Sequence, residues 1–190
     1  MPRKMIFGGF NVDTGTHIAM GVTLGGLSLI DPVISSSTET ARCVLITAII
    51  GSQIPDIDTV LKLRNNAIYI RNHRGITHSL PAVFLWPLFL LAVIYPFFPG
   101  ANFLHLWLWA FLAVFLHVFV DIFNAYGTQA LRPFYDRWIA LGWINTFDPN
   151  IFVAHCTAII LWIIGYDPRA IFPVLYGILI LYYLYRYRLR

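Results

Sequence analysis

The chain has 190 residues, of which 58% are hydrophobic and only 12% are charged, with a mean hydropathy of +0.70 and a formal net charge of +4. Because a soluble domain carries roughly 25% charged residues, this composition excludes an ordinary soluble domain. We predict an integral membrane protein of the all-α class, organised as a single membrane-embedded domain over residues 1–190.

Apolar stretches divide the chain into about six predicted membrane segments. Those at residues 80–98 and 103–120 approach the ~20 residues needed to cross a bilayer and are the clearest spans. The other four have shorter apolar runs, short enough for some of them to be re-entrant or tilted. In chain order the segments cover residues 15–30, 42–54, 80–98, 103–120, 151–166 and 170–185.

Basic residues are distributed unevenly between the ends of these segments. If six segments alternate across the bilayer, eleven of the 13 basic residues fall on one side, and only Arg42 and Arg169 fall on the other. By the positive-inside rule the basic side is cytoplasmic, and both termini lie there too. This basic rim should also attract anionic membrane lipids. The eleven residues are Arg3, Lys4, Lys62, Arg64, Arg71, Arg74, Arg132, Arg137, Arg186, Arg188 and Arg190.

The pair Asp56 and Asp58 lies in the motif PDID, directly after the second apolar segment. The proline should end or kink the helix, so both carboxylates are predicted to share a turn. Two nearby carboxylates repel unless a cation or a proton separates them, which favours a metal site or a general acid or base. The alternative interpretation is a solvated loop.

The motif HRGITHS, which begins at His73, is the most specific stretch of the sequence. The neutral imidazoles of His73 and His78 are preferred ligands of zinc, iron or manganese. Arg74 is suited to bidentate binding of a phosphate or carboxylate, and Gly75 permits a tight backbone turn. The alternative is a basic turn beside the membrane.

His117 and Asp121 stand four positions apart, which places both side chains on one face of a helix. The spacing suits two ligands of one metal ion, or a ligand and the carboxylate that orients it. A buried His-Asp pair that joins two helices explains this spacing equally well. Ionisable groups in a membrane chain are costly, so either role requires a partner.

Several other polar residues are of the types that commonly cap helices. Asp58 is suited to cap the helix that follows it, and Thr77 or Ser79 to cap the helix that begins near residue 80. Asp148 precedes a proline and is first a candidate N-cap and only second a ligand.

The remaining histidines and the aromatic end of the chain favour structural roles. His17 and His155, each taken alone, are more typical of capping or core histidines, although His17 shares the predicted cytoplasmic end. His105 lies at the opposite end of its segment. Tyrosines and arginines alternate over residues 182–190, which is typical of an interfacial belt. We expect membrane lipids as partners and no nucleic acid.

Four motifs in this order resemble the YdjM family of membrane-bound, metal-dependent hydrolases, and most closely its YfhP-like branch. They are DTGTH from Asp13, PDIDTV, RNHRGITHS, and the HxxxD pair followed by NAYGT. The resemblance covers nearly the whole chain and implies an inner-membrane protein. The ligand types and the HxxxD spacing are also remotely similar to those of zinc-dependent phospholipase C and related nucleases. The resemblance implies metal ligands at His17, Asp56, Asp58, His73, His78, His117 and Asp121.

Our leading hypothesis is a membrane-bound hydrolase that acts on a phosphoester or lipid-linked substrate at the cytoplasmic membrane face. It would use one or two divalent ions, zinc or manganese, with Asp56 or Asp58 as base and Arg74 binding substrate. Neither HExxH nor GxSxG occurs in the sequence, which argues against a common metalloprotease or serine hydrolase.

Two further classes of protein stay open at this point. A non-catalytic binding or regulatory protein would use the same residues for a structural metal, or would recruit a cytoplasmic protein through the basic rim. A cation transporter would need acidic groups near the middle of the membrane, whereas these fall at segment ends.

Overall fold

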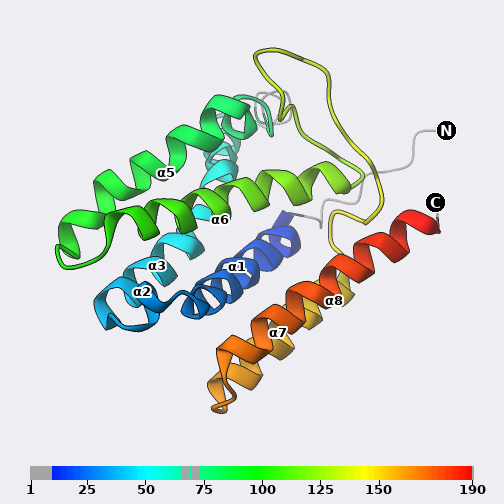
Figure 1. Ribbon diagram of the computed structural model, residues 1–190. Coiled ribbons are helices and arrows are strands. Elements are labelled where there is room, and N and C mark those ends of the chain that lie inside the picture. Colours follow the sequence, from blue (N-terminus) through cyan, green and yellow to red (C-terminus); the bar gives the residue numbers. More distant parts are fainter. Residues whose placement is uncertain (1–9, 66–68, 70–72, 190) are drawn as a thin grey trace.

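A computed structural model describes residues 10–65, 69 and 73–189 (Figure 1). Four basic residues used for the orientation, Arg3, Lys4, Arg71 and Arg190, lie outside the described residues. The described part consists of helices and loops and contains no strand, only two isolated β-bridges in the long loop at residues 124–148. The predicted all-α class is confirmed.

Six long helices in the described part each overlap one of the predicted segments. They are α1 (Phe10–Leu27), α3 (Thr38–Gly51), α5 (Leu80–Ile94), α6 (Phe103–Phe123), α7 (Pro149–Ile163) and α8 (Pro168–Arg188). Short helical turns lie between several of them. These are η1 (Ser28–Ile30), α2 (Pro32–Ser35), η2 (Ile54–Leu63), η3 (Ile76–His78) and η4 (Tyr95–Phe97).

Three of the described helices are long and apolar enough to cross a membrane: α5 continued by η4, α6, and α8. Helix α3 and η2 form a fourth candidate if they count as one span bent by 42°. Helices α1 and α7 are apolar but shorter. Length and composition therefore support three or four spans among the described residues, and the count of six stays a prediction.

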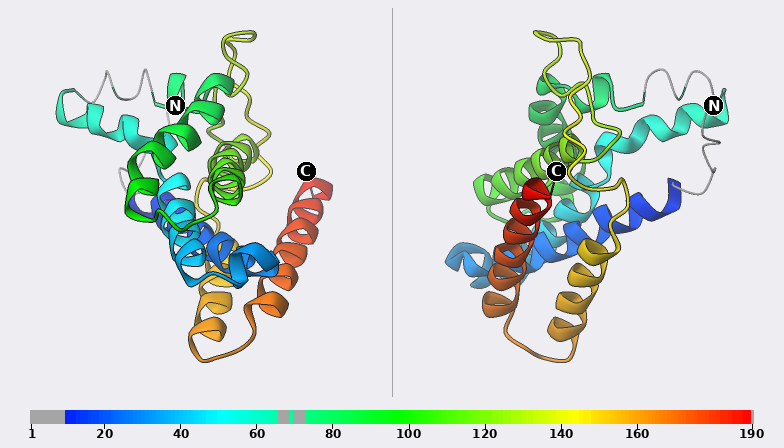
Figure 2. Two further views of the ribbon diagram at one scale, coloured as in Figure 1. Left: turned by 60° about the vertical axis from the view of Figure 1, so that its left-hand side comes forward. Right: turned by 90° about the vertical axis from the view of Figure 1, so that its right-hand side faces the viewer.

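Helix α1 lies between two helical groups (Figure 2). On one side it packs on α3, which in turn packs on α6 and α5; on the other side it packs on the hairpin of α7 and α8. Successive long helices run in opposite directions (Figure 1). The end of α3, the start of α5, the end of α6 and the start of α7 therefore lie at one end of the bundle, where the long loop also lies.

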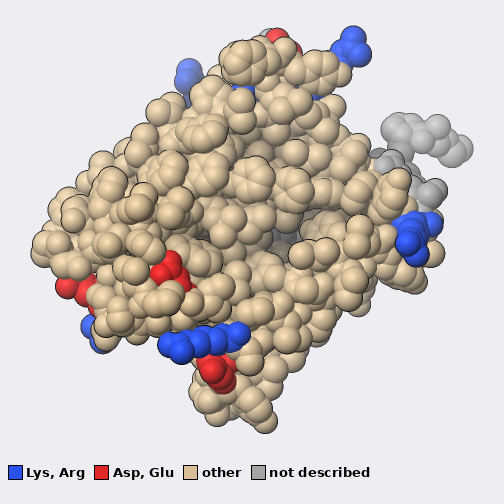
Figure 3. Space-filling model, viewed as in Figure 1, with Lys and Arg blue, Asp and Glu red and all other residues tan. Residues whose placement is uncertain are grey.

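The outer surface of the helices is largely uncharged. Figure 3 shows a broad face without Lys, Arg, Asp or Glu, with the charged side chains gathered toward the two ends of the helices. Large apolar side chains such as Leu85 and Leu181 point outward and are 62% and 67% exposed. Such a surface is unfavourable in water and fits contact with lipid.

Helices α1 and α3 approach closely because Gly21 and Gly25 lie at their contact. A Cβ atom on Gly21 would lie 2.7 Å from the Cα of Ile49, and one on Gly25 would lie 3.0 Å from the Cα of Leu45. Two small residues four positions apart are a common basis of helix pairing in membranes. His17 stands four positions before Gly21, so the same face of α1 carries His17 into the bundle.

Replacing Gly21 by alanine should destabilise the fold by about 1–3 kcal/mol, because the new methyl group meets the backbone of α3, which cannot rotate away. Thermal unfolding in detergent measures the effect. Gly177→Ala in α8 is the matched control, since beyond its chain neighbours and the backbone of its own helix no atom lies within 4 Å of its Cβ position. Equal melting temperatures for the two variants would contradict the close approach.

Candidate metal centre

Four side chains from three segments direct their ligand atoms toward one point. Asp56 comes from η2, His78 from η3, and His117 and Asp121 from the last turns of α6. Their four inward atoms all lie within 4.8 Å of one another. Three of the residues are almost completely buried, while the Asp56 side chain is 17% exposed. The bent junction of α3 and η2 brings Asp56 over the end of α6.

Five of the six distances between these atoms are close to the edges of a four-coordinate site. His78 Nε2 lies 3.3 Å from His117 Nε2, 3.3 Å from Asp121 Oδ2 and 3.5 Å from Asp56 Oδ1. His117 Nε2 lies 3.5 Å from Asp121 Oδ2 and 3.7 Å from Asp56 Oδ1. Donor atoms placed tetrahedrally about 2.0–2.1 Å from an ion lie about 3.3–3.4 Å apart. The cluster therefore has the size that a divalent ion requires.

The two inward carboxylate oxygens lack hydrogen-bond donors. Among the described residues, neither Asp56 Oδ1 nor Asp121 Oδ2 has a hydrogen-bond partner, although both are buried. A buried carboxylate oxygen without a partner is costly, and a cation between two such oxygens removes that cost. With no ion at the centre, burial opposes a positive charge on His78, but the neighbouring carboxylates of Asp121 and Asp56 outweigh burial and raise the pKa of His78. The centre thus favours positive charge.

The hydrogen bond at the outer nitrogen of His117 fixes which of its nitrogens faces the centre. His117 Nδ1 lies 2.6 Å from the carbonyl oxygen of Ser52, at the end of α3. A carbonyl only accepts, so Nδ1 carries the proton and Nε2 presents a lone pair to the centre. Such a bond is the usual way in which a protein orients a metal-binding histidine.

A relay of two hydrogen bonds orients His78 in the same way. The hydroxyl of Thr77 lies 3.0 Å from Asp58 Oδ2 and 3.0 Å from His78 Nδ1. The carboxylate only accepts, so Thr77 donates to Asp58 and its oxygen accepts the Nδ1 proton of His78. In the neutral ring, His78 Nε2 therefore also faces the centre with a lone pair.

The outer oxygen of Asp121 is held from several sides. Arg74 Nη2 lies 3.1 Å from Oδ1, the side-chain amide of Asn124 donates to it over 3.2 Å, and His17 Nε2 lies 3.5 Å away. The His17 ring also stacks on His117, with centroids 4.0 Å apart. These contacts leave Oδ2 directed at the two imidazoles. His17 lies beside the centre, on the outer oxygen of a candidate ligand.

Asp58 and His73 form a second group that shares Asp56 with the first. His73 Nδ1 lies 2.8 Å from Asp58 Oδ1. The second oxygen of Asp58 accepts hydrogen bonds from the Arg74 backbone N–H (2.9 Å) and from Thr77. Both oxygens of Asp58 are therefore used to hold neighbouring residues in place.

Arg74 is buried, with a side chain only 2% exposed. Its backbone adopts φ 59°, in the left-handed region that residues other than glycine rarely occupy. Its N–H bonds Asp58, its carbonyl accepts from Gln129 N–H, and its guanidinium pairs with Asp121. These three anchors hold the strained conformation. The tight turn predicted at Gly75 instead has its positive φ at Arg74, and Gly75 has φ −92°.

Of the predicted helix caps, that of Asp58 is wrong, that of Ser79 is confirmed in position only, and that of Asp148 is confirmed. Asp58 lies inside η2 and bonds His73 and Thr77. Ser79 occupies the N-cap position of α5, but its side chain makes no capping hydrogen bond and donates to the Ile76 carbonyl. Asp148 caps α7 by accepting from Asn150 N–H over 3.0 Å.

His105 and His155 lie outside both ligand groups. His105 pairs with Asp31 at the other end of the bundle. His155 is buried between α1 and α7, and its Nδ1 lies 2.9 Å from the Thr23 hydroxyl.

Three supporting residues were not singled out as part of the site in the sequence. The Ser52 carbonyl orients His117, Thr77 orients His78, and Asn124 orients Asp121. A backbone carbonyl leaves no signal in a sequence. Asn124 did have one, because it opens the NAYGT motif, where its side chain also accepts from the backbone N–H groups of Tyr126 and Gly127.

The fold and the site together define a helical membrane protein with a candidate metal centre at one end of its helices. The chain belongs to the YdjM family: the family description "YdjM inner membrane protein" matches residues 12–190. The predicted resemblance is confirmed, and the family places the protein among inner-membrane proteins.

A curated relative in this family is the "Uncharacterized protein YfhP" of Bacillus subtilis (strain 168). It is 61% identical over 175 residues, which cover 92% of this chain and 54% of the relative. The chain thus spans about half the length of this relative. No solved structure matches the chain.

Thr77→Val should weaken metal binding by about 10–100-fold, because it removes the hydroxyl that orients His78. Competition between the purified protein and a zinc chelator measures the affinity. Thr47→Val is the matched control: Thr47 is also buried, but its hydroxyl bonds only the Cys43 carbonyl within α3. An unchanged zinc affinity in Thr77→Val would show that the relay does not support a metal ligand.

Proposed function

We propose that the protein is a membrane-bound, metal-dependent hydrolase that cleaves a phosphoester or a lipid-linked substrate. The observation that carries this proposal is the convergence of two imidazole nitrogens and two carboxylate oxygens without hydrogen-bond donors. Asp56, His78, His117 and Asp121 would hold the ion, zinc or manganese, since both accept nitrogen and oxygen ligands. A bound ion of this kind lowers the pKa of a coordinated water and stabilises charge on phosphoryl oxygens.

Access of water to the centre favours the side of Asp56. This is the one candidate ligand of the four with an appreciably exposed side chain, and Ile57 beside it is half exposed. Water arriving there would meet Asp56 first and the buried histidines behind it. Tyr126 is 44% exposed, and its ring lies 6.0 Å from that of His73 in the neighbouring group.

The charges around the centre favour an anionic substrate. The Arg74 guanidinium pairs with Asp121 and lies 5.5 Å from the centre of the Tyr126 ring. A fixed positive charge beside a cation attracts phosphate more strongly than a neutral group. Because Arg74 is buried and paired, it would add a positive charge beside the substrate and hold Asp121 in position. Direct contact between Arg74 and the substrate stays a prediction.

Proton transfer is best assigned to His73. Asp56 faces the ion position, and both oxygens of Asp58 are occupied by hydrogen bonds. His73 is next to Asp56 and is oriented by Asp58 through Nδ1, the arrangement that prepares an imidazole to accept a proton. The base role predicted for Asp56 or Asp58 therefore has less geometric support than this one.

The number of ions is best assigned as one. A second ion at Asp56, Asp58 and His73 would have to replace the hydrogen bond between Asp58 and His73, whereas the first group needs no such loss. Both groups share Asp56, so a bridging carboxylate would join the two sites if a second ion binds.

A non-catalytic metal-containing binding or regulatory protein is the second candidate. The specific observation in its favour is that four protein ligands fill a tetrahedral shell, as in structural zinc sites, while catalytic sites keep a position open. A cation transporter has less support, because the cluster lies at the helix ends.

Hydrolysis assays with zinc or manganese present test the leading proposal. Phosphodiester and phospholipid substrates should be cleaved by the wild type, and His78→Ala should reduce the rate at least ~100-fold, because a catalytic ion contributes several kcal/mol. His105→Ala is the control, since its histidine is outside both ligand groups. Stoichiometric metal without turnover on any of these substrates would favour the structural role.

The site is also proposed to face the cytoplasm, on the basis of the basic residues at that end of the segments. Arg137 in the long loop and Arg169 at the start of α8 are both exposed and lie at opposite ends of the bundle. With a membrane-impermeant maleimide on intact cells, Arg169→Cys should be labelled and Arg137→Cys should be labelled only after lysis. The unsubstituted protein controls for Cys43 and Cys156. The reverse pattern would place the site on the outer face.

A further inference from the structure

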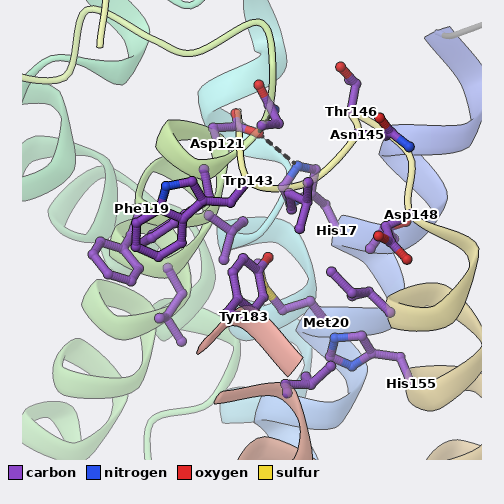
Figure 4. Close-up of a pocket in the computed structure, with 18 of the residues that line it drawn as sticks. His17, Met20, Phe119, Asp121, Trp143, Asn145, Thr146, Asp148, His155 and Tyr183 are labelled. Carbon is purple, nitrogen blue, oxygen red and sulfur yellow. Dashed lines mark hydrogen bonds and ion pairs between the residues drawn. The ribbon is translucent and has the colours of Figure 1, made fainter. Parts of the chain in front are cut away.

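A cavity of about 390 Å³ lies against the candidate metal centre, between α1, α6, α7 and α8 (Figure 4). This size falls within the ~300–1,000 Å³ typical of ligand sites. The cavity meets the centre at Asp121 and His17, which line one end of it. Figure 4 shows Asp121 and His17 side by side, joined by a dashed line, with Met20, Tyr183 and His155 below them.

The rest of the cavity is mainly apolar. Met20 of α1, Leu116 and Phe119 of α6, and Leu179 and Tyr183 of α8 contribute to its wall. Polar groups at the far end already have partners, because the Thr23 hydroxyl lies within hydrogen-bond distance of both His155 and Tyr176. A hydrocarbon chain therefore fits the main body of the cavity, and a polar ligand does not.

The cavity opens toward the side of the protein that faces lipid. Phe119 and Ile180 line it and are also exposed on the outer surface, at 41% and 62%. They belong to α6 and α8, which are both long and apolar enough to cross a membrane. A hollow between these two helices is visible in Figure 3. A lipid chain could enter there without crossing water.

We propose that this cavity binds one hydrocarbon chain of a membrane phospholipid, with the phosphate of its head group at the Asp121 end. This inference rests on the proposed function and names its substrate class: a phosphoester lipid taken directly from the bilayer. Two features commit the occupant to a lipid. The mouth lies between two candidate spans. At the polar end, an ion bound at the centre beside Asp121 would attract the phosphate of a head group.

Photo-crosslinking in liposomes tests the proposal. The probe is phosphatidylglycerol with a diazirine at the end of one acyl chain, and peptide mapping locates its adducts. In the wild type, adducts should form on cavity residues such as Met20 and Leu179, and also on the outward-facing Leu181. Excess unlabelled lysophosphatidylglycerol should suppress the cavity adducts and leave those on Leu181 unchanged. Adducts only on outward-facing residues would overturn the proposal.

A matched pair of variants on α6 adds a second test. Leu116→Trp should fill part of the cavity and lower the yield of cavity adducts roughly tenfold, equivalent to about 1.4 kcal/mol of binding. Leu108→Trp makes the same change on an exposed position outside the cavity and should leave the yield unchanged. Equal yields in the two variants would overturn the proposal. If Leu116→Trp does not fold, the competition experiment decides alone.

The crosslinking result is separable from the failure of the hydrolase proposal, because it requires no turnover. Saturable cavity adducts in a protein that cleaves nothing would support lipid binding and reject the hydrolase. Turnover of phospholipid without cavity adducts would support the hydrolase and reject the cavity as its lipid site.

Discussion

The constraint on which the rest of this structure depends is the burial of two carboxylates and two imidazoles at one end of an apolar helical bundle. Outside water, each unpaired charge is costly, so the surrounding structure must supply either partners or a cation. The outer atoms of Asp121, His78 and His117 have partners from the protein, while the inner atoms face each other. Each of these side chains thus has one atom held by the protein and one atom facing the centre, as the proposed ion site would require.

The packing of the helices explains how residues so distant in the chain arrive at this point. Gly21 and Gly25 let α1 lie against α3, and α3 ends against α6, so the Ser52 carbonyl reaches His117. The turns at η2 and η3 then lay Asp56 and His78 over the end of α6. The backbone of Arg74, held in the left-handed region from three sides, is the strained element of this arrangement. Strain of this kind persists only where the neighbouring structure determines it, and it is commonly found at functional sites.

Much of the site could be predicted from residue types. Which of these residues face the ion position, and which only orient their neighbours, could not. Histidines and aspartates at segment ends are rare enough in an apolar chain to mark a site, and the HxxxD spacing correctly placed His117 and Asp121 on one face. Asp56 and Asp58, only two positions apart, have different surroundings, which depend on how η2 meets η3. No periodicity encodes that contact. The same holds for Thr77, predicted as a possible cap, whose hydroxyl instead links Asp58 to His78.

Asp121 belongs to both the metal centre and the wall of the apolar cavity, and this shared position has a thermodynamic consequence. If an ion at the centre changes the affinity of the cavity for its ligand by some factor, the ligand must change the affinity for the ion by the same factor. If a bound metal increases the affinity for lipid, then bound lipid increases the affinity for the metal. An empty cavity would then release the ion more easily, so the metal content of the purified protein would depend on the lipid that accompanies it.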